Sequence, residues 1–220
     1  DSLKNFQKEH NLTIFHLMGQ HVNYKQRYRT KQARFWASSY EDKRPELTNA
    51  QRKMLSHYDN ATLYNDSIVA QIVKRFQKQD AIVIYVPDHG EECYEENRGF
   101  ICRNHSAEID WPLAHYEFEI PFWIYCSPKY IRNHRDIYRQ IRKAKDKRFM
   151  TDALPHLLLY LAGIETPTYK EEYNILSPKY DEMRPRILKN SADYDKLRDA
   201  HLEKIKKEES KKEKKKERRN

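Results

Sequence analysis

The chain alternates between short apolar runs and longer amphipathic stretches. Residues 12–18 (LTIFHLM) are mostly apolar or β-branched and stop at Gly19, which predicts a buried strand. Residues 81–86 (AIVIYV) predict a second buried strand that ends at Pro87, and residues 119–125 (EIPFWIY) predict a third. Continuous apolar runs are typical of strands whose two faces are both covered.

Two longer stretches have helical periodicity. In residues 58–79 the apolar side chains recur near helical spacing, which predicts an amphipathic helix with its first three residues as the N-terminal cap. Residues 151–162 predict another helix, with Thr151 or Asp152 as N-cap and Gly163 as C-cap. The alternation of strands and helices predicts an α/β fold, a largely parallel sheet flanked by helices.

Charge is concentrated at the C-terminal end. The chain carries 42 Lys and Arg against 33 Asp and Glu, a net charge of +9. Residues 201–220 hold ten of the basic and five of the acidic side chains, so residues 1–200 keep 32 against 28, or +4. We therefore expect a folded part over residues 1–190 and a charged tail, helical or disordered, over residues 191–220.

Two polar segments lie where ligands bind in such sheets, at the carboxyl ends of strands. Asp88-His89-Gly90-Glu91 follows the second strand, and Gly90 lets the chain turn so that the carboxylate and imidazole before it converge on a divalent metal. His21 follows the first strand and His105 lies in a long polar segment. If the two loops meet, these histidines share a pocket with the Asp-His pair. His16 precedes the strand end, so we expect a hydrogen-bonded core histidine there.

Two further features bear on the cellular setting. Cys93 and Cys102 flank an eight-residue loop, and they either pair in an oxidising compartment or remain separate buried thiols. No stretch approaches the roughly 20 apolar residues that a membrane helix needs. The chain also enters its first apolar run within about a dozen residues, which we interpret as the start of an excised piece.

Five blocks in order carry a family resemblance: HLMGQHVNYKQRY, HYDNATLYNDSIVAQIV, AIVIYVPDHGEE, FEIPFWIYCSPKY and LLLYLAGIETPTYKEEYNILSP. Together they resemble the phosphoethanolamine transferase branch of the sulfatase and alkaline phosphatase superfamily. They span most of residues 12–190 and are similar to the C-terminal part of the family's catalytic domain. The resemblance implies an alkaline-phosphatase-like α/β fold.

The resemblance also implies roles for particular residues. Asp88 and His89 match the family's zinc-binding pair, which an upstream Glu and a Thr nucleophile complete. His21 matches the second His of the H-x-x-G-x-H block, and His105 matches a His after D-H-G-E. In the family these two contact the phosphoryl group, the phosphoethanolamine or a further zinc. Glu91 either orients His89 or faces solvent.

One block departs from the family's pattern. The family follows the second His with Gly-Pro, whereas this chain has Val22-Asn23. The upstream Glu and Thr have no counterpart here either. We therefore expect this chain alone to bind zinc poorly and to be inactive.

For the complete parent, the resemblance implies a zinc-dependent transferase. It moves phosphoethanolamine from phosphatidylethanolamine to lipid A or a core sugar through a Thr-bound intermediate. The expected location is the periplasmic face of a bacterial inner membrane, with an anchor outside these residues. The partners implied are the two lipids and the missing N-terminal half of the catalytic domain, and no nucleic acid.

Two other functions are consistent with the sequence. The first is a sulfatase or phosphodiesterase of the same superfamily, which would use a formylglycine precursor or another nucleophile upstream. The second is a basic module that binds nucleic acid or a membrane surface without catalysis, supported by the tail and the charge of +9. Binding through phosphates weakens steeply with salt, so a gel-shift assay at two salt concentrations separates this function from the others.

Overall fold

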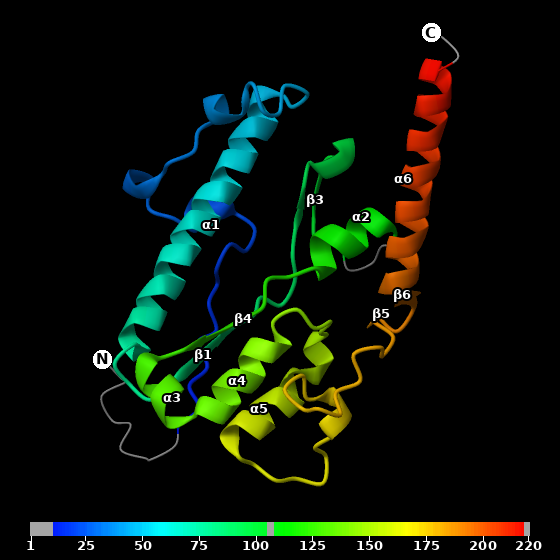
Figure 1. Cartoon of the computed structure of the whole chain (residues 1–220). Helices are drawn as coiled ribbons and strands as arrows, with labels where there is room; N and C mark the ends of the chain where they lie inside the picture. Colours follow the sequence, from blue (N-terminus) through cyan, green and yellow to red (C-terminus); the bar gives the residue numbers. More distant parts are fainter. Residues whose placement is uncertain (1–10, 105–107, 218–220) are drawn as a thin grey trace. The chain divides into compact units, whose positions relative to one another are not determined.

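The computed structural model describes residues 11–104 and 108–217, and it divides into two compact units (Figure 1). The first unit consists of Asp1–Ala81, Cys126–Lys145 and Thr151–Tyr180, and the second of Ile82–Tyr125, Asp146–Met150 and Asp181–Asn220. Helices and strands are both present, and the α/β fold class predicted from the sequence is confirmed.

The first unit is built around one long helix, α1 (Asn49–Phe76). Its N-cap is Thr48, whose hydroxyl accepts from the backbone N–H of Gln51, while the Gln51 side chain accepts from the N–H of Thr48. This reciprocal capping box satisfies two backbone donors that have no partner within the helix. The helix predicted over residues 58–79 is confirmed, but its predicted start is wrong by nine residues. The proposed cap residues lie inside α1, because the true start signal lies in a polar stretch.

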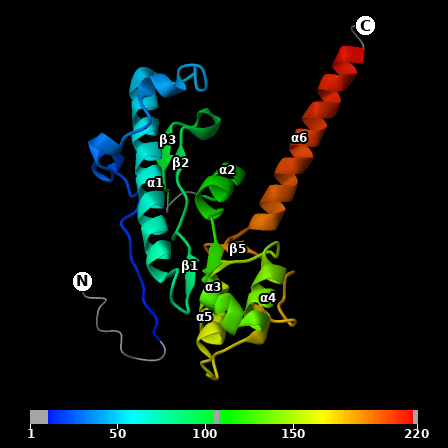
Figure 2. The same cartoon turned by 60° about the vertical axis from the view of Figure 1, so that its left-hand side comes forward.

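The N-terminal segment, residues 11–18, is extended but forms no strand, so the first predicted strand is wrong. A strand exists only when a neighbouring backbone satisfies its N–H and C=O groups, and no strand of the described chain does so here. Ile14 is 80% exposed and Met18 is 61% exposed. His16 is exposed as well, which contradicts the expected core histidine. The segment runs alongside α1 in both views (Figures 1 and 2), with Phe15 edge-on to Phe76.

The rest of the first unit consists of short helical elements. They are η2 (Tyr24–Gln26), η3 (Thr30–Gln32), η4 (Ala37–Tyr40), α3 (Pro128–Asn133), α4 (Arg135–Ala144), η7 (Thr151–Ala153), α5 (Leu154–Ala162) and η8 (Glu171–Tyr173). Gly163 ends α5 at φ 64°, as predicted for a C-cap. The predicted N-cap is wrong, because Thr151 and Asp152 form the 3-10 turn η7 and Ala153 precedes α5 without a side-chain cap.

The second unit holds the strands. They are β1 (Ile82–Tyr85), β2 (Glu92–Cys93), β3 (Phe100–Cys102), β4 (Trp123–Cys126), β5 (Ile187–Leu188) and β6 (Ala192–Asp193). Its helical elements are η5 (Glu95–Asn97), α2 (Trp111–Leu113), the π-helical turn η6 (Ala114–Phe118) and α6 (Tyr194–Glu217). Strand β1 pairs with β4, and β2–β3 and β5–β6 are antiparallel hairpins. The second and third predicted strands are confirmed as β1 and β4.

The charged C-terminal helix α6 is anchored through its first turn. Tyr194 is buried in an apolar cluster with Leu113 and Leu188. Asp195 accepts from Arg186 at 2.6 Å and forms ion pairs with Arg148 and Arg198 as well. Leu197 packs against the same cluster and His201 stacks on Trp111, whereas α6 is exposed from Leu202 onward as far as its side chains are described.

The ion pairs of Asp195 make the free energy of unfolding depend on pH in the acid range. Hydrogen bonding from Arg186 holds the pKa of Asp195 below its ordinary value of 3.8. The folded state therefore gains stability from this carboxylate above its unfolded pKa, and loses that gain as the pH falls through the lower folded pKa. We expect D195N to remove part of the loss of unfolding free energy between about pH 5 and pH 2. Urea titrations across this range measure it. D136N, at an exposed ion pair with Arg139, is the control and should behave like the parent chain.

Candidate metal centre

A carboxylate and an imidazole lie next to each other in the loop that follows strand β1. The last residue of this strand is Tyr85, and Asp88 and His89 follow three and four residues later. The backbone N–H of His89 donates to Asp88 Oδ1 at 3.2 Å. The other carboxylate oxygen, Oδ2, lies 3.6 Å from His89 Nε2. Two ligand atoms about 2.0–2.2 Å from one tetrahedral zinc are separated by roughly 3.3–3.6 Å, so this spacing suits a shared metal.

The imidazole of His89 has a defined orientation. Its Nδ1 lies 2.7 Å from the carbonyl oxygen of Gly90, and its Nε2 lies 2.6 Å from Arg103 Nη1. A carbonyl only accepts and a guanidinium only donates, so Nδ1 carries the proton and Nε2 presents its lone pair. A backbone carbonyl on one ring nitrogen and an acceptor lone pair on the other is the usual arrangement of a metal-binding histidine. The side chain of His89 is 21% exposed and that of Asp88 is 87% exposed.

Gly90 is required by a close backbone approach. Its N–H donates to the carbonyl oxygen of Glu117 at 2.8 Å, and a Cβ at this position would overlap the carbonyl oxygen of Tyr116. Its φ is not among the positive values of the chain. The sequence-based explanation, a turn that only glycine makes, is therefore replaced by a steric one. The residue was identified correctly for a different reason.

Glu117 holds two parts of the site, and sequence reasoning missed it. Its side chain is 4% exposed and accepts from the backbone N–H of Asn104 at 2.8 Å, while its own carbonyl binds Gly90. It therefore links the chain after β1 to the chain that follows β3. No local pattern marks this residue, because a glutamate in a polar stretch is typical of a solvent-exposed face.

The residues next to the Asp-His pair belong to the β2–β3 hairpin. Glu91 Oε1 lies 3.7 Å from the Cys102 Sγ. Glu92 is fully buried beside Arg98, with Oε1 2.7 Å from Nε, and burial raises the pKa of Glu92. Cys93 and Cys102 lie on neighbouring strands, and both are thiols in the structure. The hairpin begins within three residues of His89, and its first strand, β2, is buried.

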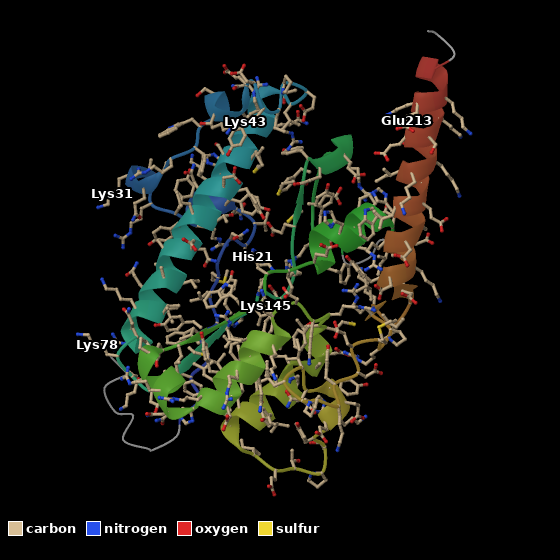
Figure 3. All side chains as sticks on the ribbon, in the orientation of Figure 1. His21, Lys31, Lys43, Lys78, Lys145 and Glu213 are labelled. Atoms are coloured by element: carbon tan, nitrogen blue, oxygen red, sulfur yellow. The ribbon has the colours of Figure 1, made fainter. Side chains whose placement is uncertain are left out.

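His21 belongs to the first unit and is exposed (Figure 3). Its backbone carbonyl accepts from Arg27 Nε at 3.0 Å. Asn23, where the family has Pro, adopts φ 70° and precedes η2, so the departure from Gly-Pro gives a local turn of its own. The preceding Gly19, at φ 50°, passes Asn65 of α1. The structure brings Asp88 and His89 together, whereas His21 lies in the other unit and His105 lies outside the described residues.

The donor set of the pair is small. Within residues 11–104 and 108–217, no group of three or more His, Cys, Asp or Glu side chains is arranged to hold a metal ion. Asp88 and His89 therefore supply two protein ligands, fewer than the three or four of a catalytic or structural zinc site.

The family follows from comparison with known proteins. The model of the family described as Sulfatase matches residues 1–164. The chain belongs to the sulfatase family. This membership covers the whole Asp-His region and extends to the end of α5.

Relatives in the sulfatase family are transferases. The chain is 31% identical over 175 residues to "Phosphoethanolamine transferase EptC" of Escherichia coli, which covers 78% of this chain and 29% of that protein. It is 31% identical over 140 residues to "Kdo(2)-lipid A phosphoethanolamine 7''-transferase" of the same species, over 62% of this chain and 23% of that protein. The chain thus spans less than a third of the curated relatives it matches. The predicted resemblance to the phosphoethanolamine transferase branch is confirmed.

Solved structures of sulfatase-family members show the same fold. The C-terminal periplasmic domain of EcEptC from Escherichia coli superposes with a TM-score of 0.66 at 28% identity, covering 83% of this chain and 51% of that one. The same domain in complex with Zn superposes with a TM-score of 0.64, covering 81% and 50%. The chain therefore spans about half of the solved domain.

Proposed function

We propose that this chain is the C-terminal part of a zinc-dependent phosphoethanolamine transferase. The complete protein would move phosphoethanolamine from phosphatidylethanolamine to lipid A or a core sugar. The observation that carries the proposal is the convergence of Asp88 Oδ2 and His89 Nε2 at 3.6 Å in a sulfatase-family chain whose relatives are named as such transferases. Residues 1–190 would form the catalytic part and residues 191–220 a charged tail.

The Asp-His pair suits one side of a zinc site. Asp88 would bind through Oδ2 and His89 through Nε2, with the Nδ1 proton held by Gly90. Bound zinc supplies a Lewis acid that lowers the pKa of a nucleophilic hydroxyl and offsets charge on phosphoryl oxygens. A Thr from the missing N-terminal half would be that nucleophile. The support for zinc is the donor chemistry of the pair and the Zn complex of the similar periplasmic domain.

Two histidines would act on the phosphoryl group. His21 and His105 match family residues that contact the phosphoethanolamine, and an imidazole can donate a hydrogen bond or a proton to a phosphoryl oxygen near neutral pH. Glu91, held next to Cys102, would support the pair from behind.

The proposed location is the periplasmic face of a bacterial inner membrane. The support is the similarity to periplasmic domains and the lipid acceptor in the name of a relative. Over residues 11–104 and 108–217, no helix combines the length and the apolar character that crossing a membrane demands. The proposal includes a membrane anchor in another part of the parent protein.

Zinc titration by calorimetry tests the site. We expect the chain to bind one zinc weakly, because two protein ligands are fewer than a complete site uses. D88A and H89A should each weaken binding by more than about tenfold, since even residues that only support a ligand cost 10–100-fold when removed.

D136A is the matched control, because Asp136 is equally exposed, at 83% against 87%. Its zinc affinity should equal that of the parent chain. Unchanged affinity in both D88A and H89A would remove the metal site from the proposal, and tight stoichiometric binding by the parent chain would show that the site is complete.

A further inference from the structure

Arg103 takes the place on His89 that a metal would use. Its Nη1 lies 2.6 Å from Nε2, while Asp88 Oδ2 lies 3.6 Å from the same nitrogen. Both groups come from loops of the second unit, Arg103 from the residue after β3. The pair of candidate ligands is thus accompanied by a positive charge from the protein itself.

We propose that Arg103 gates the metal site: its guanidinium occupies the metal-facing nitrogen of His89 and leaves when zinc binds. This inference rests on the proposed zinc site. An imidazole nitrogen has one lone pair in the ring plane, which serves either a hydrogen bond from Arg103 or a bond to zinc. The two cations therefore compete for one atom.

The gate also fixes the state of His89 before the metal arrives. A guanidinium is always protonated in proteins, so it accepts nothing and requires His89 to present an unprotonated Nε2. A neutral imidazole with its proton on Nδ1 is the form that binds zinc. Arg103 therefore holds His89 in the form that binds zinc while it occupies the nitrogen that zinc would use.

After zinc binding, the displaced guanidinium remains on the same loop, tied by the bond from Asn104 N–H to Glu117. Its planar set of five donors fits two oxygens of a phosphoryl group at once. Arg103 is thus in place to bind the anion that the metal holds. Arg103 therefore competes with zinc and also binds phosphate. Removing its side chain should strengthen zinc binding and weaken phosphate binding.

The experiment uses the full 220-residue chain, with zinc and then inorganic phosphate as probes in calorimetry. R103A should bind zinc about tenfold more tightly than the parent, the change produced by roughly 1.4 kcal/mol of removed competition. At saturating zinc, R103A should bind inorganic phosphate more weakly than the parent. Misfolding would weaken both, so this pair of opposite changes separates gating from structural damage.

R103K retains a charge without the planar fork, and its zinc affinity should lie nearer the parent than R103A does. R139A, which removes an exposed arginine, should change neither affinity. Equal or weaker zinc binding by R103A overturns the gate, and unchanged phosphate binding overturns the phosphoryl role. If D88A and H89A also bind zinc like the parent, the metal site itself fails, which is a result distinct from failure of the gate.

Discussion

Replacing Gly90 by alanine is expected to disrupt the loop that carries Asp88 and His89. The added Cβ would overlap the carbonyl oxygen of Tyr116, a backbone atom that cannot rotate away. The bond from Gly90 N–H to the Glu117 carbonyl would have to break or stretch. Overpacking of this kind costs about 1–3 kcal/mol, and a lost buried backbone bond adds to it, so we expect a loss of roughly 3 kcal/mol or more.

Urea unfolding of G90A measures this loss, and zinc titration of the same variant shows whether the pair still converges. G163A is the matched control, because a Cβ at Gly163 has nothing within 4 Å. Its φ of 64° costs an alanine about 1 kcal/mol, without contact with the site. If G90A were no less stable than G163A, the close approach of η6 to Gly90 would be wrong.

Replacing Asn60 by alanine is the second change with a large expected effect. Asn60 is 3% exposed, and its Oδ1 accepts from the backbone N–H groups of Arg34 at 2.6 Å and Phe35 at 3.1 Å. Its Nδ2 donates to the carbonyls of Phe35 and Ser56, each at 2.8 Å. Alanine leaves these partners without their side-chain bonds, and unsatisfied buried groups cost about 1–3 kcal/mol each. We expect a total loss of about 2–4 kcal/mol.

Hydrogen exchange gives the local readout of N60A, because the amides of Arg34 and Phe35 should lose protection before those of α1. Q71A on the same helix is the control, since the exposed Gln71 side chain donates to Ser67 O within its own helix. Protection of Arg34 and Phe35 that is unchanged in N60A would show that another contact holds this segment.

The elements that the sequence predicted correctly are those determined by local signals. Strands β1 and β4 are apolar runs bounded by proline or by the cap of the next helix, and Gly163 ends α5 in the left-handed conformation that glycine favours. The start of α1 was missed because the capping box at Thr48 precedes nine residues with few apolar positions. Local periodicity therefore located helices better than it located their first residues.

The features that the sequence predicted wrongly, or did not predict, depend on contacts with residues far along the chain. Residues 12–18 have the composition of a buried strand, yet strand formation requires a second backbone, which no local pattern supplies. The same reason explains why the sequence did not identify Arg103 and Glu117 as residues of the site. Arg103 matters through its contact with His89, and Glu117 through its contacts with Asn104 and Gly90. The sequence around Arg103 or Glu117 gives no sign of these contacts. The Asp-His pair was predictable because both ligands are adjacent in the chain.

The extended segment at residues 11–18 has a consequence for how the chain behaves in solution. Leu12 is 71% exposed and Ile14 80% exposed, on a backbone that no strand of the described chain pairs. An extended apolar peptide can pair with such a backbone by strand addition, and the same segment of another molecule is one such peptide. The net charge of +9 opposes this self-association by mutual repulsion. High salt screens that repulsion and therefore favours aggregation of the chain.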